Sequence, residues 1–282
     1  MRLAQKIVLS YIRTRFTILA ALSMRKAAEK AFRLFTTPQS RNRKKLPPIF
    51  EKAESIRFPF NGETIQGYRW NHPSESGRKA LILHGYESSV INFDRYVKPL
   101  IRKGYEVLAF DAPAHGRSTG KTLNALVYKN LVMHIHDVYG PIQSYIAHSF
   151  GGLSLTLALA EIEHGPDYRV VLIAPATETT RAIDNFFRFL RLPPGMRPEF
   201  DRIIEKIGTH PASWYSITRA APHIRAQVLF LQDKQDNMTP YSDVLPLMEK
   251  DYPNFRFIIS DGLGHRRIYR DNASVKAILE FL

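Results

Sequence analysis

The stretch "YIAHSFGGLSL" (residues 145–155) joins two kinds of sequence at Ser149. The residues before the serine form a short apolar run typical of a buried strand, and those after it read as a helix. Small residues surround the junction, with Ala147 two positions before the serine and Gly151 two positions after it. A serine at a strand–helix junction is most often a helix cap or a packing residue. The function of Ser149 therefore depends on what the rest of the chain places beside it.

Short apolar runs like the one before Ser149 recur from residue 50 onward. Two of them, "ESIRFPF" and "TIQGYRW", flank "NGE" and predict a β-hairpin. Six more predict buried strands, at 79–85, 105–113, 144–150, 169–175, 227–233 and 255–262. Helical patterns lie between them, at 90–103, 123–139, 151–164, 240–250 and 273–282. This alternation predicts an α/β fold with a mostly parallel, eight-stranded sheet and helices on both faces.

Polar residues follow three of the predicted strands in the chain order Ser149, Asp236, His265. The carboxyl ends of parallel strands meet at one edge of a sheet, and ligands bind there. A serine hydroxyl is a weak nucleophile that needs a base to take its proton, and the base in turn needs an acceptor that orients it. We therefore expect these three side chains to lie together.

Four segments together resemble the α/β-hydrolase superfamily over about residues 50–282. They are the stretch around Ser149, "LHGY" (83–86), "DKQDNMTP" (233–240) and "GLGHRR" (262–267). The superfamily carries its nucleophile in a G-x-S-x-G elbow, and here Ala147 replaces the first glycine. The resemblance implies Ser149 as the nucleophile, His265 as the general base and Asp236 as the carboxylate that orients it. Asp233 is the alternative carboxylate.

The resemblance also implies an oxyanion hole built from the backbone N–H groups of Tyr86 and Phe150. It implies no metal and no organic cofactor. The chain contains no cysteine, which leaves out a thiolate nucleophile and disulfides. His134 and His136 lie two positions apart in a predicted helix and so point to different faces, which argues against a metal site there.

Residues 176–225 hold no predicted strand and many aromatic residues, and they predict a helical lid inserted over the carboxyl edge. Phe186, Phe187 and Trp214 of this lid are candidates for binding an apolar acyl or aryl group. The expected activity is that of a serine hydrolase that cleaves small-molecule carboxylic esters through an acyl-enzyme. Two alternatives stay open: a lysophospholipase or monoacylglycerol lipase at a membrane surface, and a non-catalytic binding protein with the same fold.

The net charge of +14 belongs mostly to residues 1–45, which hold 12 Lys and Arg and a single acid, Glu29. Residues 46–282 hold 28 basic and 25 acidic residues. The body is thus close to neutral, and we expect no nucleic-acid partner. The sequence predicts two parts: a basic amphipathic helix with a linker over 1–45, and an α/β-hydrolase domain over 46–282.

The N-terminal pattern predicts a helix up to about Phe35. At 100° per residue one side is apolar, and it carries Leu3, Ile7, Val8, Tyr11, Ile12, Ile18, Leu19 and Leu22. Three roles stay open for it: packing on the main body, lying on an anionic membrane surface, or serving as a signal peptide. The uncharged run "FTILAALSM" (16–24) is too short to span a bilayer. We expect a mature N-terminus near Met1 and a cytoplasmic protein, with membrane association through this helix as an option; the oligomeric state is left open.

Overall fold

The computed structural model describes residues 3–282, with side chains from residue 6 onward; Met1 and Arg2, on which the expected mature N-terminus falls, lie outside the described residues. The chain forms two compact units. The sheet unit comprises residues 38–177 and 217–282, and the helical unit comprises residues 3–37 and 178–216.

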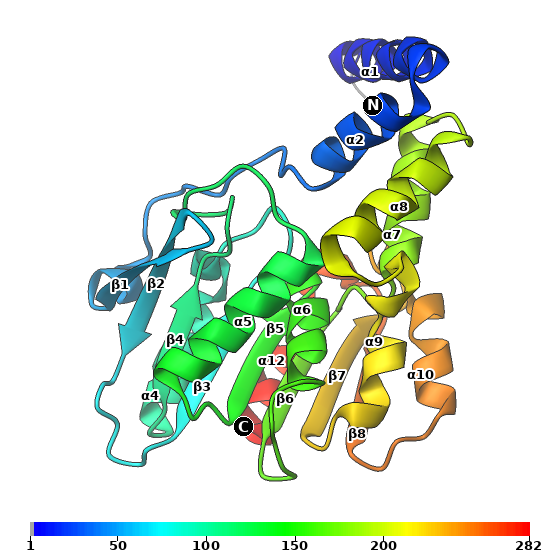
Figure 1. The fold of residues 1–282 in the computed structure, drawn as a ribbon. Helices are drawn as coiled ribbons and strands as arrows, with labels where there is room; N and C mark the ends of the chain where they lie inside the picture. The colour runs from blue at the N-terminus through cyan, green and yellow to red at the C-terminus, as the bar shows by residue number, and fades with distance from the viewer. Residues whose placement is uncertain (1–2) are drawn as a thin grey trace. The chain divides into compact units, whose positions relative to one another are not determined.

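The sheet unit contains an eight-stranded sheet with the strand order β1-β2-β4-β3-β5-β6-β7-β8 (Figure 1). Strands β3 to β8 run parallel, whereas β2 pairs antiparallel with both β1 and β4. Each strand coincides with an apolar run predicted from the sequence, so the predicted mostly parallel sheet is confirmed. The strands are β1 Glu54–Phe60, β2 Glu63–Trp70, β3 Lys79–Leu83, β4 Glu106–Phe110, β5 Ser144–His148, β6 Arg169–Ile173, β7 Gln227–Asp233 and β8 Phe255–Ser260.

The predicted hairpin between β1 and β2 turns at Asn61 and Gly62. Both residues have a positive φ, 48° and 77°. A two-residue turn of the type that matches strand twist requires this conformation at both central positions, and Asn-Gly is the pair that adopts it most readily.

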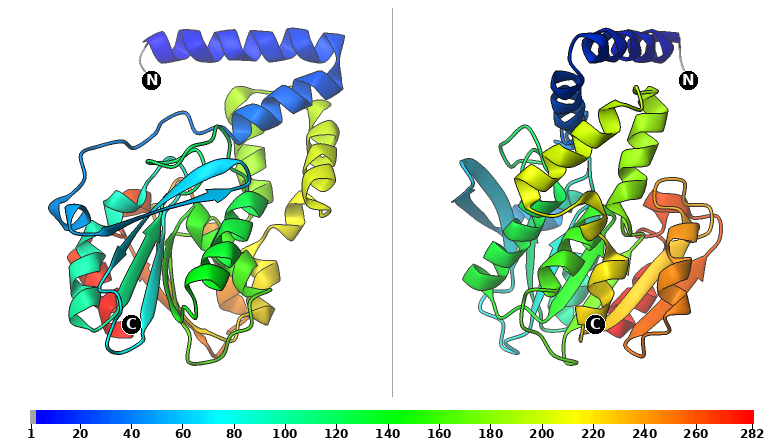
Figure 2. Two further views of the ribbon diagram at one scale, coloured as in Figure 1. Left: turned by 60° about the vertical axis from the view of Figure 1, so that its left-hand side comes forward. Right: turned by 45° about the vertical axis from the view of Figure 1, so that its right-hand side comes forward.

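Helices cover both faces of the sheet (Figures 1 and 2). Helices α4 (Asp94–Arg102) and α12 (Asn272–Phe281) lie on one face, and α5 (Ala125–Tyr139) and α6 (Phe150–Leu159) lie on the other. Alternate strand residues such as Ile82 and Ala109 share one buried cluster with Tyr96 of α4 and Ile278 of α12. The remaining short elements of this unit are α3 Pro48–Glu51, η1 Val90–Phe93, α9 Ile217–Ala220, η3 Ala221–His223, η4 Tyr241–Asp243, α10 Leu245–Glu249 and α11 Gly264–Arg267.

Two predicted helices are shorter than expected. The helix predicted to reach residue 164 ends at Leu159; Glu161 and Glu163 follow, and negative side chains disfavour the negative end of the helix dipole. The helix predicted over 240–250 consists of η4 and the five-residue α10, with Pro246 in the first turn of α10. Proline is favoured in the first turn of a helix, where its missing N–H would have no partner in any case, and α10 begins beside Pro246.

The helical unit contains α1 (Leu3–Leu22), α2 (Met24–Phe35), α7 (Thr179–Leu190), α8 (Met196–Gly208) and η2 (Ala212–Trp214). The single N-terminal helix predicted up to Phe35 is broken at Ser23. Ser23 has extended backbone and caps α2, because its hydroxyl accepts a hydrogen bond of 3.3 Å from the Lys26 N–H.

Helix α2 packs on the helices of the insertion. Phe32 meets Phe200 with ring centroids 5.5 Å apart, and Phe35 meets Phe186 at 5.2 Å. Ala28 and Ala31 of α2 are fully buried, so small side chains allow the helix backbones to approach closely. The N-terminal segment and the insertion therefore share one hydrophobic core, although they are far apart in sequence.

The ends of the insertion are joined by a short stem. Glu178 and Ser216 form an antiparallel bridge, and the Ile217 N–H donates to the Thr177 carbonyl at 2.9 Å. Residues 38–45, expected to form a linker, lie in the sheet unit, where the Gln39 N–H donates to Glu87 Oε1 at 2.7 Å.

Candidate active site

Ser149 stands directly after β5, at the carboxyl edge of the sheet, and precedes α6. Its backbone has φ 54° and ψ −121°, a combination that residues other than glycine rarely adopt. The turn is held by backbone hydrogen bonds, since the Ser149 N–H donates to the Ile173 carbonyl at 3.0 Å and its carbonyl accepts from the Ala176 N–H at 3.1 Å. This is the strained elbow predicted from "AHSFG", and Ala147 is accommodated in it, fully buried between Leu83 and Leu172 of the neighbouring strands.

The loop after β3 approaches the elbow so closely that two glycines are required. A Cβ on Gly151 would lie 2.6 Å from the His84 carbonyl oxygen, and a Cβ on Gly85 would lie 2.8 Å from the Ser149 Cβ. Neither distance is possible for real atoms without movement of the backbone or of the serine. The "HG" of "LHGY" therefore brings the Tyr86 segment against the serine, a role of Gly85 that the sequence analysis missed.

Ser149, His265 and Asp236 form one chain of hydrogen bonds. His265 Nε2 lies 3.0 Å from Ser149 Oγ, and His265 Nδ1 lies 2.7 Å from Asp236 Oδ2. All three residues are buried. Because an ionised carboxylate can only accept, Nδ1 carries the ring proton, and the lone pair of Nε2 faces the serine hydroxyl. This arrangement can take the proton from Ser149 Oγ.

Asp236 is held as an anion by donors from its own loop. Its Oδ1 accepts from the N–H groups of Met238 and Thr239 at 2.8 and 2.9 Å, and its Oδ2 accepts from the Thr239 hydroxyl at 2.8 Å. Burial alone would raise the pKa of Asp236, but His265 and the Thr239 donors lower it below its ordinary value. The role of Thr239 was not predicted from the sequence. The motif "DNMTP" contains the signal, because an aspartate side chain in a turn can accept hydrogen bonds from the backbone N–H groups of the residues that follow it.

Asp233, the alternative carboxylate, has a different set of partners. Its Oδ2 accepts from the Ser260 hydroxyl at 2.7 Å and from the Leu263 N–H at 2.9 Å, and its Oδ1 accepts from the Gln235 N–H at 2.9 Å. Burial would raise its pKa, but these hydrogen bonds, together with the nearby Gly264 N–H, lower the pKa of Asp233 to about 2. Asp233 thus ties the loop after β7 to the loop that carries His265.

Two further buried histidines connect the loops beneath the serine. His84 Nδ1 lies 2.7 Å from the Gly85 carbonyl and its Nε2 accepts from the Ala112 N–H at 2.9 Å. His115 Nδ1 lies 2.9 Å from the Pro113 carbonyl and its Nε2 accepts from the Glu87 N–H at 3.0 Å. In each ring one nitrogen must donate and the other must accept, so both rings are neutral. Burial lowers the pKa of His84 to about 4, and burial together with the neighbouring His84 lowers that of His115 to about 3.

His148, the residue before Ser149, contacts both the backbone and the ring of His265. Its Nε2 lies 3.0 Å from the His265 carbonyl, and the two rings are 4.7 Å apart. Because a carbonyl only accepts, Nε2 carries the proton; Nδ1 is buried without a hydrogen-bond partner among residues 3–282. Burial, with the neighbouring His265, lowers the pKa of His148 to about 3. The ring is therefore neutral and positions the His265 backbone.

The two residues predicted for the oxyanion hole are neighbours. The rings of Tyr86 and Phe150 meet edge to face with centroids 5.7 Å apart. Phe150 is the first residue of α6, so its N–H has no acceptor one turn earlier in the helix.

The three aromatic lid candidates lie in the helical unit. Phe186 and Phe187 both pack against Phe200, and Trp214 stacks on His210 with ring centroids 4.2 Å apart. Their contribution to substrate binding stays a prediction.

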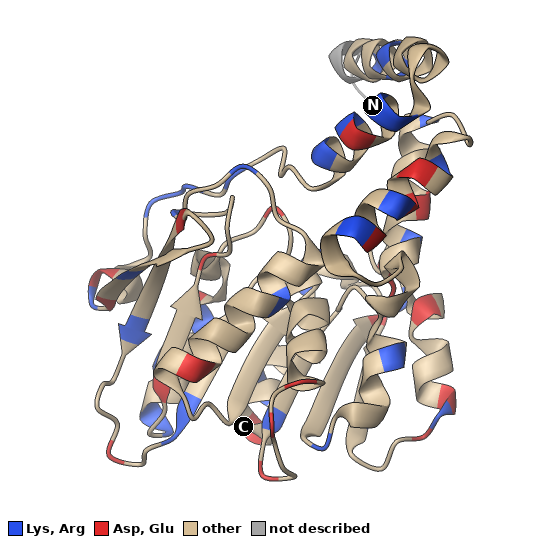
Figure 3. Cartoon of the chain, in the orientation of Figure 1, with Lys and Arg blue, Asp and Glu red and all other residues tan. Residues whose placement is uncertain are grey.

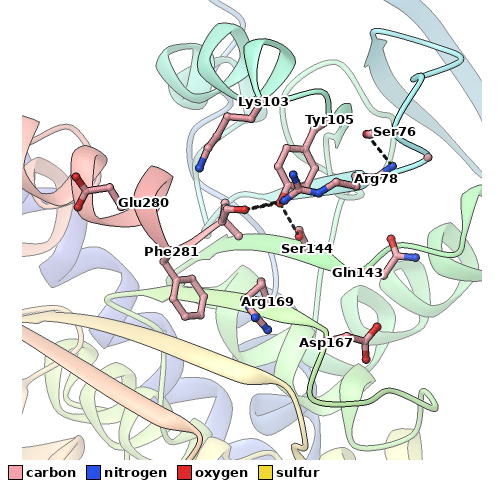
Figure 4. A pocket seen from close by; sticks show the side chains of 12 residues that line it. Ser76, Arg78, Lys103, Tyr105, Gln143, Ser144, Asp167, Arg169, Glu280 and Phe281 are labelled. Atoms are coloured by element: carbon pink, nitrogen blue, oxygen red, sulfur yellow. Dashed lines mark hydrogen bonds between the residues drawn. The ribbon is translucent and has the colours of Figure 1, made fainter.

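A separate polar cavity of about 550 Å³ opens at the other edge of the sheet (Figure 4). Its walls come from residues at or just before the starts of β3, β4, β5 and β6 and from the last three residues of the chain. The Arg78 guanidinium stacks on the Tyr105 ring at 4.0 Å, and both side chains donate to the Leu282 carbonyl. Since Ser149 lies after the carboxyl end of β5, this cavity does not belong to the serine site. Within residues 3–282, no group of three or more His, Asp or Glu side chains is placed to hold a metal ion.

A strained strand–serine–helix turn in a mostly parallel eight-stranded sheet, with a carboxylate loop after β7 and a histidine loop after β8, defines the α/β-hydrolase superfamily. The model of the family described as serine aminopeptidase, S33, matches residues 75–226, more than half of the chain. The chain belongs to this family and is a hydrolase of the α/β-hydrolase superfamily. The matched region contains Ser149, whereas Asp236 and His265 lie beyond it.

Two proteins of Bacillus subtilis (strain 168) are similar in sequence. The uncharacterized protein YqkD is 25% identical over 249 residues, which cover 83% of this chain and 81% of YqkD. The uncharacterized hydrolase YugF is 32% identical over 113 residues, which cover 38% of this chain and 40% of YugF.

Solved structures share the fold. The esterase Pf2001 of Pyrococcus furiosus aligns with a TM-score of 0.64 and 21% identity over 87% of this chain and 95% of the esterase. Est1E of Butyrivibrio proteoclasticus, solved with ferulic acid bound, aligns with a TM-score of 0.62 and 20% identity over 80% of this chain and 97% of Est1E.

Proposed function

We propose that this protein hydrolyses carboxylic esters of small molecules through an acyl-enzyme formed on Ser149. The observation that carries the proposal is the hydrogen-bonded chain from Ser149 Oγ through His265 to Asp236, with distances of 3.0 and 2.7 Å. The strained φ of 54° at Ser149 supports it, because the fold maintains this conformation in spite of its strain.

In the first half of the reaction, Ser149 Oγ attacks the ester carbonyl carbon while His265 Nε2 takes the hydroxyl proton. The carbonyl oxygen becomes an oxyanion, and the Phe150 and Tyr86 N–H groups donate to it. Asp236 stabilises the imidazolium that forms. The tetrahedral intermediate then expels the alkoxide, which takes the proton from His265 and leaves as the alcohol.

In the second half, His265 accepts a proton from water, and the hydroxide attacks the acyl-enzyme carbonyl. Collapse of the second tetrahedral intermediate breaks the bond to Ser149 Oγ. His265 returns the proton to the serine, and the carboxylic acid leaves. His265 thus ends in its starting tautomer, so the cycle can repeat.

The aromatic composition of the insertion favours an apolar acyl or aryl group. Phe186, Phe187 and Trp214 supply large apolar surfaces that a flat or long apolar group can contact. The same serine chemistry cleaves amides, and the family description names an aminopeptidase. A direct comparison of ester and amide substrates is therefore part of the test.

The test begins with an activity-based fluorophosphonate, which reacts covalently with an activated serine. We expect stoichiometric labelling of the native chain and none of Ser149→Ala, while Ser242→Ala, at an exposed serine, labels as the native chain does. Labelling that survives Ser149→Ala, or a native chain that never labels, would overturn the assignment of the nucleophile.

The substrate class is tested with p-nitrophenyl esters of increasing acyl length beside aminoacyl p-nitroanilides. We expect kcat/KM to be higher for the esters and to rise with the apolar surface of the acyl group. Higher kcat/KM for the anilides would replace the esterase proposal by a peptidase one.

A further inference from the structure

Helix α1 has two apolar faces, and only one of them is buried. Leu9, Phe16 and Ala20 lie on the face that packs within the helical unit. The apolar side predicted from the sequence is the opposite one: Ile7, Val8, Tyr11, Ile18 and Leu22 are between 56% and 79% exposed. Leu3, also predicted there, lies outside the residues whose side chains are described.

The exposed apolar side chains form a stripe along α1, with the exposed Thr14 and Arg15 between Tyr11 and Ile18. At 100° per residue, Ile7, Tyr11, Ile18 and Leu22 point within a narrow sector directly opposite Leu9. We call this set the outer face of α1. Exposed apolar side chains that gather on one face of a helix mark an interaction site.

A basic side chain adjoins the outer face. Arg15 is exposed, lies 20° from Leu22 at 100° per residue, and has its guanidinium 5.5 Å from the centre of the Tyr11 ring. Lys6 is also exposed but lies farther round the helix. The neighbouring α2 adds four exposed basic side chains and one acid, Glu29 (Figure 3); they are Arg25, Lys26, Lys30 and Arg33.

We propose that the outer face of α1 lies on the surface of an anionic phospholipid bilayer. An apolar stripe bordered by Lys and Arg is the pattern of a helix that lies in the plane of a membrane interface. The apolar side chains enter the boundary between headgroups and acyl chains, and the basic side chains meet lipid phosphates.

The charge pattern favours a bilayer over a second copy of the chain, since two such basic surfaces would repel each other. None of the helices within residues 3–282 is long and apolar enough to cross a membrane. The contact we propose is therefore with the surface. It does not depend on the reaction assigned to Ser149.

The test uses the full chain and extruded vesicles of phosphatidylcholine, with or without 30 mol% phosphatidylglycerol. We expect co-sedimentation with the anionic vesicles only, and weaker binding as NaCl is raised. Ile18→Asp with Leu22→Asp should reduce the partition coefficient by about tenfold or more. Val138→Asp is the matched control, because Val138 and Ile18 are both 57% exposed.

A charge variant separates the two contributions. Lys6→Glu with Arg15→Glu should reduce binding to the anionic vesicles by about tenfold or more and lower its salt dependence. Lys98→Glu with Arg102→Glu changes the net charge equally on exposed residues of the sheet unit and should have a much smaller effect.

The insertion of α1 into the bilayer can be measured with a fluorophore on one introduced cysteine, because the sequence has no cysteine of its own that would react with the label. An environment-sensitive fluorophore on Ile18→Cys should shift to the blue with anionic vesicles, whereas the same label on Val138→Cys should not. Equal binding by the Ile18/Leu22 and Val138 variants would overturn the proposal. A native dimer in solution that Ile18→Asp dissociates would also overturn it, in favour of a second copy. The fluorophosphonate labelling of every variant is expected to be unchanged, so failure here is distinct from failure of the esterase proposal.

Discussion

Asp233 accepts a hydrogen bond of 2.9 Å from the N–H of Leu263, two residues before His265. Asp236, three residues after Asp233, instead contacts the His265 ring itself at 2.7 Å. One short loop thus presents two carboxylates to the same histidine segment, one to its backbone and one to its imidazole. Replacing Asp236 should therefore affect catalysis, whereas replacing Asp233 should affect stability.

Asp236→Asn should lower kcat by about 10⁴-fold, because an amide cannot fix the His265 tautomer or stabilise its imidazolium. Asp233→Asn should retain most of kcat in the folded protein. Steady-state kinetics on an activated ester measure both. The reverse result, with activity lost in Asp233→Asn and kept in Asp236→Asn, would show that the wrong carboxylate has been assigned.

Asp233→Asn should instead lower the free energy of unfolding by about 2 kcal/mol near neutral pH, since the pKa falls from 3.8 to about 2 on folding. A carboxyl group whose pKa is lower in the folded chain stabilises the fold at pH values above its pKa in the unfolded chain. This stabilisation is lost as the pH falls through the pKa of the folded chain. The difference between native and variant should therefore shrink between about pH 4 and pH 2. Urea titrations at pH 7 and pH 3 measure it.

Gly85→Ala should damage both stability and activity. Its Cβ would lie 2.8 Å from the Ser149 Cβ, so we expect a loss of about 1–3 kcal/mol and a fall in kcat of about 10²-fold from displacement of the serine. Gly165→Ala is the matched control: its Cβ would lie 2.7 Å from Asp167 Oδ1, the end of a side chain that can move. Equal effects of both changes would show that close approach at the elbow is not what requires Gly85.

Ala147→Gly, which restores the usual elbow glycine, should not improve catalysis. Ser149 already lies 3.0 Å from His265 Nε2 with alanine at this position. We expect kcat to change by less than about threefold and stability to fall by about 1 kcal/mol, as for glycine in the interior of a strand. Ala109→Gly in β4 should cost the same stability. A large gain in kcat would mean that the Ala147 methyl group holds the serine away from its productive position.

Stability should fall steeply in mild acid. His84, His115 and His148 have pKa values of about 4, 3 and 3 in the fold, against 6.5 for a free imidazole. Below about pH 6.5 the unfolded chain therefore binds protons that the folded chain does not, and the folded state loses up to about 1.4 kcal/mol per histidine for each pH unit down to about pH 4.

Urea titrations between pH 7 and pH 4 measure this slope. His115→Asn should reduce it by about a third, and His223→Asn, at an exposed position, serves as the control. Imidazole NMR signals of the three buried rings should remain those of the neutral form at pH 5. Protonated rings in the folded protein at that pH would contradict the prediction.

The sheet could be predicted almost completely from sequence. Buried parallel strands need apolar side chains on both faces, so runs such as "RVVLI" and "QVLFL" differ sharply from their surroundings. The order of Ser149, Asp236 and His265 after three of these strands then places them at one edge, because parallel strands have their carboxyl ends on the same side.

The contacts that hold the site could not be predicted so well. Thr239 and Gly85 act through loop geometry, which has no periodicity. In α1, the periodicity correctly identified an apolar side, but that side is exposed. The buried side is the opposite one, which carries Leu9 and Phe16. A pattern along one helix does not say which of two apolar sides meets the protein, because that depends on the partner helices and on the break at Ser23.

The stem formed by Glu178 and Ser216 has a consequence for how this protein can change over generations. The two ends of the insertion are joined at this stem, so a different inserted segment could replace residues 178–216 without altering the strand order. Phe32 and Phe35, however, pack on Phe200 and Phe186, which belong to the present insertion. The first helices and the insertion must therefore be inherited as a pair, and an exchange of one between relatives would leave the core of the other open to water.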